Sequence, residues 1–326
     1  MQTTFKAWEV QSYGPPEVLS PVLREMPVPT QGQVLIRIRA SAVTRADGMM
    51  RAGQPKFARL FLGLSRPRAG LAGTSFSGDV VAVGDGVTRF QPGDAVFGEA
   101  GLQFGANASH ICLEADGSLV AKPKTLDYAE AAVMCDGAMT SWHFLTEVAP
   151  VKPDDKVLIL GGAGSLGTAA IQIAKSLGAR VSATASARNT ELLKRLGADQ
   201  TIDYTNDDAL HRGSDYNVVF DTLGVSSFNA AKPALADGGR YTCPVLDLRL
   251  LRDMIVSRIF DSRRAIFAAA GMAKPETHRA HLAHLLGLIA EERFAPVMDR
   301  TYPFSDLVEA HQYVATGHKR GNVVVV

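Results

Sequence analysis

The sequence predicts an α/β protein of two domains, one β-rich and one built on a doubly wound parallel sheet. The first observation is length, because 326 residues exceed what one hydrophobic core usually organises. The second is pattern: short strands and turns up to about residue 124, then strands alternating with helices. The third is a glycine-rich turn between a buried strand and a helix. We expect residues 1–124 and 272–326 to form the β-rich domain and residues 125–271 the sheet domain.

Alternation in the first 120 or so residues predicts the β-rich domain. VLIRIRA (34–40) alternates apolar and polar residues with a period of two, as a half-buried strand does. GDVVAVGDGV (78–87) and FQPGDAVFGEA (90–100) join strands to glycine turns. These segments predict a barrel-like arrangement of short strands.

The sheet domain is predicted by uninterrupted apolar runs. LDYAEAAVMCDGAMTSWHFLTEV (126–148) has helical spacing, and KVLILGG (156–162) is a run typical of a strand buried on both faces. SLGTAAIQIAKSLG (165–178) follows as a helix that ends at glycine. Further strands are expected at 180–186, 200–204, 216–222, 238–245 and 264–270, and further helices at 189–197 and 226–236.

The last segment predicts one helix and one strand. Leu282, Leu285, Leu286 and Ile289 fall on one helical face. The closing GNVVVV is a strand, and we expect it to return to the β-rich domain because the parallel sheet is already complete.

Composition narrows the class of protein. A net charge of +1 leaves no broad basic field of the kind that nucleic acid binds. The 3 cysteines are far apart in sequence, which indicates a reducing compartment rather than a disulfide framework. The N-terminal MQTTFKAWEV has no apolar signal segment, and no apolar run is long enough for a bilayer. We predict a cytoplasmic protein without nucleic-acid or membrane partners.

The glycine-rich turn fits the dinucleotide-binding pattern G-x-G-x-x-G. Its context, after a buried strand and at the start of a helix, is the one that the pattern requires. The first glycine permits the turn, the second lets backbone N–H groups approach a pyrophosphate, and the third permits close packing of helix and strand. The predicted pyrophosphate-binding residues are Gly162, Ala163, Gly164, Ser165, Leu166 and Gly167.

The end of the second strand predicts which dinucleotide is bound. An acid there would bind the ribose 2′-hydroxyl of NADH and repel a 2′-phosphate, but VSATAS contains no acid. Ser186 can donate a hydrogen bond and Arg188 can pair with a phosphate, while Tyr204 ends the neighbouring strand. The alternative is that Arg188 is an exposed residue at a helix start. A cation is poorly placed there without an anion, so we predict NADPH.

The chain resembles the medium-chain dehydrogenase/reductase superfamily, in its quinone oxidoreductase (zeta-crystallin-like) branch. The resemblance runs from YGPPEVL (13–19) to GHKRGNVVVV (317–326). Its markers are GTSFSGDVVAVGDGVTRFQPGDAVFG, GAMTSWHFL, KVLILGGAGSLGTAAIQIAKSLGA, LGADQTIDY and ADGGRY. It implies a GroES-like catalytic domain split around a Rossmann domain, a homodimer, and NADPH-dependent reduction of quinones or α,β-unsaturated carbonyl compounds.

The resemblance also allows a check for zinc, because the superfamily includes zinc alcohol dehydrogenases. The first two ligand positions of those enzymes hold Thr44 and Thr74 here, and the third falls at about Asp136. A catalytic zinc needs about three good protein ligands, which two hydroxyls and one carboxylate do not supply. We therefore predict no metal.

Other site residues follow from the resemblance and from strand ends. Thr140 matches a family position near the nicotinamide. Leu223 and Gly224, and then Pro244 and Val245, follow strands at the carboxyl edge where ligands of such sheets bind.

The sequence does not single out one residue as the proton donor of the reaction. Thr44 and Asp47 are candidate polar groups of the substrate pocket, and the alternative for Asp47 is a loop residue or a helix cap. A tyrosine that is common in the family is replaced by Met49. The apolar segment 49–70, including Phe57, Phe61 and Leu62, either lines the pocket or packs a domain interface.

The expected function is therefore zinc-independent reduction of a small apolar quinone or conjugated carbonyl compound by NADPH. Two alternatives remain open. One is an enoyl-thioester reductase, for which Arg59, Arg66 and Arg68 would have to form a basic entrance. The other is a non-catalytic NADPH-binding protein of the crystallin-like or regulatory kind. A homodimer is expected through the edge strand near 264–270, because an apolar unprotected edge invites pairing.

Overall fold

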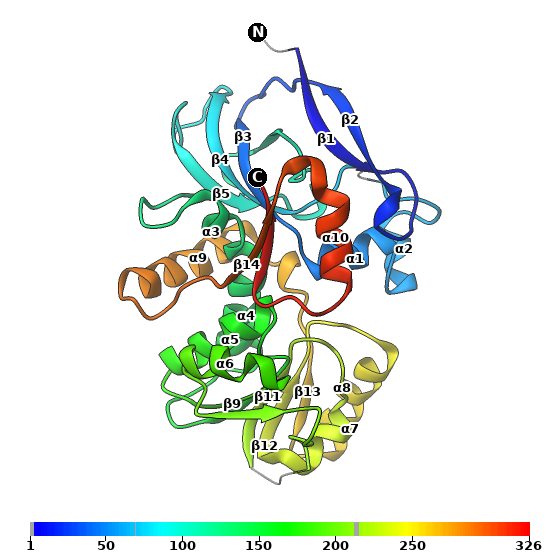
Figure 1. Cartoon of the computed structure of the whole chain (residues 1–326), viewed down its shortest axis with the longest axis vertical. Coiled ribbons are helices and arrows are strands. Elements are labelled where there is room, and N and C mark those ends of the chain that lie inside the picture. Colours follow the sequence, from blue (N-terminus) through cyan, green and yellow to red (C-terminus); the bar gives the residue numbers. More distant parts are fainter. Residues whose placement is uncertain (1–2, 69, 212–214) are drawn as a thin grey trace. The chain divides into compact units, whose positions relative to one another are not determined.

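The computed structural model describes residues 3–68, 70–211 and 215–326, shown in Figure 1. The chain divides into two compact units. The first unit consists of residues 1–136, 274–282 and 298–326, and the second of residues 137–273 and 283–297. The fold is α/β, as predicted, with a mainly antiparallel sheet in the first unit and a parallel sheet in the second.

The first unit is organised by a 7-stranded sheet with the order β14-β15-β3-β4-β5-β7, with β6 also paired to β3. Its strands are β3 (Gln33–Ala42), β4 (Ser75–Val83), β5 (Ala95–Glu99), β6 (His110–Glu114), β7 (Ser118–Ala121), β14 (Met298–Tyr302) and β15 (Asn322–Val325). A separate pair is formed by β1 (Thr4–Val10) and β2 (Leu19–Glu25). Strand β15 pairs antiparallel with β3, which confirms that the closing GNVVVV segment returns to the β-rich part.

Three longer helical elements pack on this unit. They are α1 (Arg45–Ala52), α3 (Tyr128–Ala132) and α10 (Leu307–Ala315), and the shorter α2 spans Arg59–Leu62. The inner face of α10 buries Leu307 and Ala310 against Trp8 of β1 and Val323 of β15. This packing holds α10 beside the first strand and places it near α1.

The second unit is a parallel sheet with the order β10-β9-β8-β11-β12-β13. The strands are β8 (Lys156–Leu160), β9 (Arg180–Ala185), β10 (Gln200–Asp203), β11 (Tyr216–Asp221), β12 (Leu235–Thr242) and β13 (Arg264–Ile266). The helices of this unit are α4 (Met139–His143), α5 (Ser165–Ser176), α6 (Thr190–Arg195), α7 (Phe228–Ala231) and α8 (Leu248–Phe260). Helix α9 (Pro275–Ala290) contributes residues to both units. The chain reverses its direction of winding between β8 and β11, where doubly wound sheets bind ligands.

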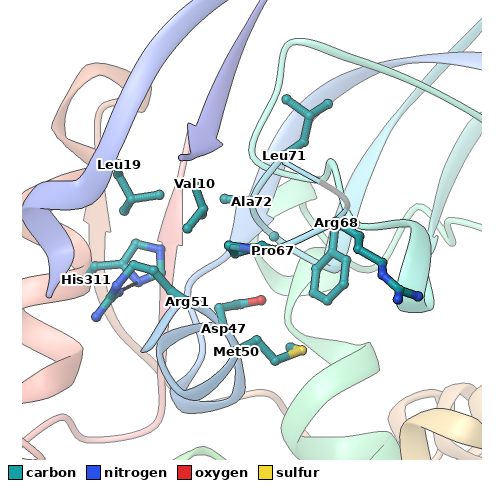
Figure 2. Close-up of a pocket in the computed structure, with 12 residues that line it drawn as sticks. Val10, Leu19, Asp47, Met50, Arg51, Pro67, Arg68, Leu71, Ala72 and His311 are labelled. Atoms are coloured by element: carbon teal, nitrogen blue, oxygen red, sulfur yellow. Dashed lines mark hydrogen bonds between the residues drawn. The ribbon is translucent and has the colours of Figure 1, made fainter. Parts of the chain in front are cut away.

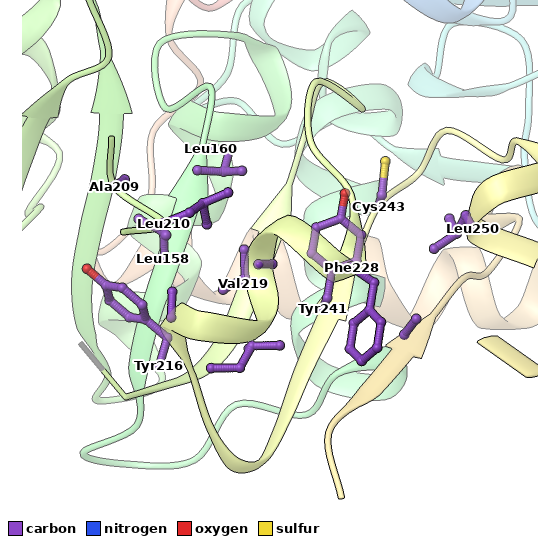
Figure 3. Close-up of a cluster of buried hydrophobic side chains, with 14 of the residues drawn as sticks. Leu158, Leu160, Ala209, Leu210, Tyr216, Val219, Phe228, Tyr241, Cys243 and Leu250 are labelled. Carbon is purple, nitrogen blue, oxygen red and sulfur yellow. The ribbon is translucent and has the colours of Figure 1, made fainter. Parts of the chain in front are cut away.

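The apolar runs of the sequence form the middle of this sheet. Leu158 of β8 and Val219 of β11 are fully buried, and Tyr241 of β12 is nearly so. Figure 3 shows these side chains within one cluster that extends to Phe228 of α7 and Leu250 of α8. Burial on both faces explains why these strands lack polar alternation.

Three predicted elements differ from the structure. In the helix expected at 126–148, a π-helical turn at Met134–Ala138 separates α3 from α4, and a second π-helical turn at Phe144–Val148 follows α4. The helix expected at 226–236 is shorter, because Pro233 allows only a 3-10 turn after α7 and β12 begins at Leu235. The edge strand expected at 264–270 covers only β13, since the chain turns into a 3-10 helix at Ala270. Among the described residues, no helix combines the length and apolar character needed to cross a bilayer.

Candidate functional site

The glycine-rich turn of the second unit connects β8 to α5 and is built for close approach. The N–H of Gly162 donates to the carbonyl of Thr184 (2.8 Å), which ties the turn to the end of β9. A Cβ at Gly167 would lie 2.2 Å from the oxygen of Gly161, so helix and strand approach closely only with glycine there. A Cβ at Gly164 would have no neighbour closer than 3.7 Å. Gly164 is also the N-cap of α5, and no side chain caps this helix, so its first turn can receive an anion.

The loops after β11 and β12 lie against this turn. A Cβ at Gly161 would lie 2.6 Å from the side chain of Leu223, and a Cβ at Gly224 would lie 3.0 Å from Val245. Gly224 has φ +66°, which favours glycine. The structure therefore brings three predicted segments together at the carboxyl edge of the sheet, namely 162–167, 223–224 and 244–245.

Asp221, which the sequence analysis did not identify, fixes one of these loops. Its carboxylate accepts hydrogen bonds from four consecutive backbone N–H groups, those of residues 223–226, at 2.7–3.3 Å. The hydroxyl of Tyr241 donates to the same carboxylate (3.0 Å). Asp221 is fully buried. The acid directly after the buried run YNVVF was the available signal, because a carboxylate at the end of an inner strand must find donors.

Helix α4 brings Thr140 to the same turn. The hydroxyl of the adjacent Ser141 donates to the carbonyl of Leu166 (2.9 Å). A Cβ at Gly137 would lie 2.3 Å from Ser165 Oγ, so the chain before α4 packs directly on the start of α5. Thr140 is half-buried beside these contacts.

The three residues predicted to select the dinucleotide lie at the ends of neighbouring strands. Ser186 directly follows β9, and the N–H of Tyr204 donates to the carbonyl of Ala185 (3.3 Å). Arg188 is exposed in the short 3-10 helix after Ser186, and the side chain of Tyr204 is also exposed.

An acid lies near these residues, although it belongs to the third strand rather than the second. Asp203 accepts hydrogen bonds from the N–H and the hydroxyl of Thr205 (3.1 and 2.8 Å). These bonds, with others from Asn206 and the backbone of Ala187, hold the pKa of Asp203 below its ordinary value. Its negative charge therefore lies beside the segment that carries Arg188.

In the first unit, Thr44 and Asp47 form a reciprocal cap at the start of α1. Thr44 Oγ1 accepts the N–H of Asp47 (2.9 Å), and Asp47 Oδ2 accepts the N–H of Thr44 (2.9 Å). The Thr44 hydroxyl also donates to Asp47 Oδ2 (2.7 Å). The capping role considered for Asp47 is thus confirmed, and the same bonds place its carboxyl group where a hydroxyl can exchange a proton with it.

The surroundings of Asp47 favour its neutral form. Burial raises the pKa of Asp47 to about 6, against the hydrogen bonds from Thr44, and the negative charge of Asp136 raises it further. Burial likewise raises the pKa of Glu99, at the end of β5, to about 8, again with Asp136 and Asp47 contributing. Glu99 was not anticipated, because an acid at the end of an alternating strand normally faces water.

The positions compared with zinc ligands hold hydroxyls that point to a carboxyl group. Thr74 Oγ1 lies 3.5 Å from Asp47 Oδ1, and Thr44 contacts the other oxygen. In the part of the chain that the structure describes, Asp47, Glu99 and Asp136 do not bring three ligand atoms within 4.8 Å of one another. This donor set does not fit a catalytic zinc.

A small cavity of about 40 Å³ adjoins Asp47 (Figure 2). Helix α1 supplies Asp47, Met50 and Arg51 to its wall. Its other walls come from β1, β2, α10, the loop before β4 and Phe104. Of the apolar segment 49–70, Met50, Pro67 and Arg68 line the cavity, whereas the side chains of Phe61 and Leu62 lie outside the described part.

The three arginines considered for a basic entrance do not all converge. Arg24, Arg66 and Arg68 line one surface hollow. Arg59 instead donates to the carbonyls of Gly53 and Ala52 (3.0 and 3.1 Å). The hollow therefore gathers two of the three candidates.

Two protein families match the chain. Residues 30–152 match the alcohol dehydrogenase GroES-like domain, and residues 196–325 match a zinc-binding dehydrogenase family. The NADPH-dependent alkenal/one oxidoreductase of Arabidopsis thaliana is 31% identical, over 98% of this chain and 79% of its own. The 2-methylene-furan-3-one reductase of Solanum lycopersicum is 32% identical, over 98% and 78%. Among solved structures, the quinone oxidoreductase of Coxiella burnetii is 31% identical with a TM-score of 0.86, over 99% of both chains.

Proposed function

Because the chain belongs to the medium-chain dehydrogenase/reductase superfamily, in its quinone oxidoreductase branch, we propose that it reduces quinones or conjugated carbon–carbon double bonds with NADPH and without zinc. The observation that carries the proposal is the replacement of metal-ligand positions by Thr44 and Thr74, both directed at Asp47. A catalytic zinc would act as a Lewis acid on the oxygen of an unactivated alcohol or ketone, and this donor set does not hold one. Conjugation instead spreads the developing charge onto a remote oxygen that a hydrogen bond can stabilise.

The residues of the second unit fit NADPH. The room at Gly164 and the uncapped start of α5 suit a pyrophosphate, while Ser186, Arg188 and Tyr204 suit a 2′-phosphate. Thr140, Leu223, Gly224, Pro244 and Val245 would contact the nicotinamide half. NADPH, when bound, supplies the hydride.

Thr44 and Asp47 would together donate the proton to the reduced substrate. When Asp47 is protonated, its carboxyl group would donate a hydrogen bond to Thr44 Oγ1, 2.7 Å away, and the Thr44 hydroxyl would donate to the oxygen on which negative charge develops. A pKa of about 6 lets Asp47 supply and regain a proton near neutral pH. Thr44→Val should therefore lower kcat, and Thr44→Ser should restore most of it.

Steady-state assays test the reaction class. We expect turnover of a small enone and a naphthoquinone with NADPH, and little turnover of a primary alcohol with NADP⁺. Good turnover of the alcohol, with both conjugated acceptors inert, would contradict the proposal. Failure of all three substrates despite tight NADPH binding would favour the non-catalytic alternative.

The hollow lined by Arg24, Arg66 and Arg68 supports the second enzymatic candidate, an enoyl-thioester reductase. A phosphopantetheine arm is anionic and would bind such a hollow. Arg66→Ala should then raise KM for an enoyl thioester and leave KM for a naphthoquinone unchanged. Arg59→Ala is the matched control, because the guanidinium of Arg59 is bound to backbone carbonyls.

We also propose that the protein is a cytoplasmic homodimer. In the described sheet, β13 has a neighbouring strand on one side only. Next to it, α8 exposes six large apolar side chains, including Ile255, Ile259 and Phe260. Association of two edges would cover this face as well as the strand.

A further inference from the structure

Two buried polar atoms of the first unit lie opposite each other in its sheet. Ser75 of β4 pairs with Glu99 of β5 in the antiparallel register, so both side chains leave the sheet on the same face. One position further along, the N–H of Ala100 donates to the carbonyl of Thr74 (2.8 Å). Ser75 and Glu99 therefore form a pair of the non-hydrogen-bonded kind, in which side chains approach more closely. Ser75 is 1% exposed, and within the described chain neither its Oγ nor Glu99 Oε2 has a hydrogen-bond partner. Two such atoms suit a bridging water molecule.

Glu99 reaches from this buried position toward solvent. Its Oε2 is buried, whereas the side chain as a whole is only half-buried. A buried carboxylate oxygen without a donor disfavours the ionised form. Burial accordingly raises the pKa of Glu99 to about 8, and the negative charges of Asp136 and Asp47 raise it further. Glu99 is therefore mainly a neutral carboxylic acid at pH 7.

Glu99 and Asp47 belong to one buried polar cluster. The chain bends at Thr74, directly before Ser75, and Thr74 Oγ1 lies 3.5 Å from Asp47 Oδ1. Two consecutive hydroxyls thus connect the carboxyl groups, since Ser75 lies opposite Glu99 and Thr74 lies beside Asp47. The charge of Asp136 raises the pKa of both acids, and the charge of Asp47 raises that of Glu99.

The other titratable groups near Glu99 are consistent with its neutral form. From the segments packed around it they are Cys135, Asp136, Lys319 and His278, the last reached through Ser118, which is opposite Glu99 on β7. The amino group of Lys319 and the carboxylate of Asp136 attract each other, which favours an ionised Asp136. An ionised Asp136 in turn favours a proton on Glu99.

We infer that Glu99 is the acid that reprotonates Asp47 during turnover. The proton passes by way of a water on Ser75 Oγ and the hydroxyl of Thr74. This inference rests on the proposed function, in which Asp47 gives its proton through Thr44 to the reduced substrate. The O–H bond of Glu99 breaks as an O–H bond forms on Asp47, and solvent then returns a proton to the half-buried Glu99. Because Glu99 acts through Asp47, it is a positioning residue for the proton and not a catalytic residue.

The pH dependence of kcat for naphthoquinone reduction tests this role. Asp47 alone is mainly protonated only below about pH 6, whereas Glu99 keeps its proton up to about pH 8. We expect kcat of the wild type to fall above about pH 8, and kcat of Glu99→Gln to fall already above about pH 6. At pH 7.5 the variant should be roughly tenfold slower than the wild type, and at pH 5.5 the two should be equal.

Three comparisons separate this role from a structural one. Gln has the shape and charge of a neutral Glu99, so a merely structural effect would change kcat equally at both pH values. Glu99→Asp keeps a carboxyl group and should restore part of the activity at pH 7.5. Glu114→Gln is the matched control, because Glu114 also ends a strand but is exposed, and its pH profile should be that of the wild type.

Two further measurements are independent of the Glu99→Gln kinetics. Ser75→Ala removes the hydroxyl opposite Glu99 and should shift the pH profile in the same direction, even if Glu99→Gln fails to fold. Infrared spectroscopy needs no substrate: at pH 7 the wild type should show the C=O band of a protonated carboxyl group that Glu99→Gln lacks.

The outcomes distinguish this inference from the proposed function. Absence of the protonated carboxyl band overturns the inference. Naphthoquinone turnover with the same pH profile in the wild type, Glu99→Gln and Ser75→Ala refutes the role of Glu99 and leaves the proposed function intact. A protein that shows the band but reduces no acceptor refutes the proposed function, and the role of Glu99 in turnover with it.

Discussion

Replacing Asp47 with Asn should change how the stability of the protein depends on pH. In the folded protein the pKa of Asp47 is raised from 3.8 to about 6, mainly by burial. Between these values the folded state keeps a proton that the unfolded state has released, so the free energy of unfolding falls as pH rises through this window. A shift of about 2 units at about 1.4 kcal/mol per unit corresponds to about 3 kcal/mol. Asn cannot lose a proton and avoids this cost.

The expected result is a difference curve. The free energy of unfolding of Asp47→Asn, minus that of the wild type, should increase by up to about 3 kcal/mol between pH 4 and pH 7. Loss of the negative charge at Asp47 also lowers the pKa of Glu99, which adds in the same direction at higher pH. Any loss of hydrogen-bond quality with Thr44 shifts the whole curve without changing its slope.

Urea denaturation at half-unit pH steps measures this curve. Asp79→Asn is the matched control: burial alone would raise the pKa of Asp79, but hydrogen bonds from Tyr128, Arg37 and Arg39 hold it at about 2. The stability that Asp79 contributes is fully present above pH 4 and is lost only as pH falls toward 2, so its difference curve should be flat from pH 4.5 to 7.5. A flat curve for Asp47→Asn as well would refute the reasoning.

Three further predictions concern the cofactor, metal and assembly. Arg188→Ala should weaken NADPH binding roughly ten- to a hundredfold and leave NADH nearly unchanged, and Asp203→Asn should strengthen NADPH binding; equal wild-type affinity for the two cofactors would contradict this. Elemental analysis of protein purified without chelator should find well below one zinc per chain, because Thr44 and Thr74 stand at the zinc-ligand positions. Stoichiometric zinc together with activity that chelators abolish would refute the absence of a catalytic metal. Light scattering should give about twice the 34.8 kDa chain mass, and Ile255→Arg on α8 should shift it toward the monomer; a monomer at micromolar wild-type protein counts against the dimer.

The sequence by itself determined the second unit's sheet and its glycine-rich turn. Strands such as Lys156–Leu160 are buried on both faces, so their hydrophobicity is continuous and visible without knowledge of the neighbours. The turn at 162–167 could also be predicted from local sequence, because the roles of its glycines depend on backbone only a few residues away. The pairing of Asn322–Val325 in the first sheet was also predicted, because the strands expected earlier in the chain already completed the parallel sheet.

Only the tertiary structure decided the character of the candidate site in the first unit. Thr44 and Asp47 are near in sequence, but the burial that raises the pKa of Asp47 comes from segments distant in the chain. The charge of Asp136 raises the pKa of Glu99, although the two residues are far apart in the sequence. Arg51, which donates a hydrogen bond to His311 Nδ1 (2.7 Å), is separated from it by 260 residues. Local periodicity indicates which face of a helix or strand is buried. The pKa of a buried side chain depends instead on which distant segments pack around it, and those contacts form only when the chain folds.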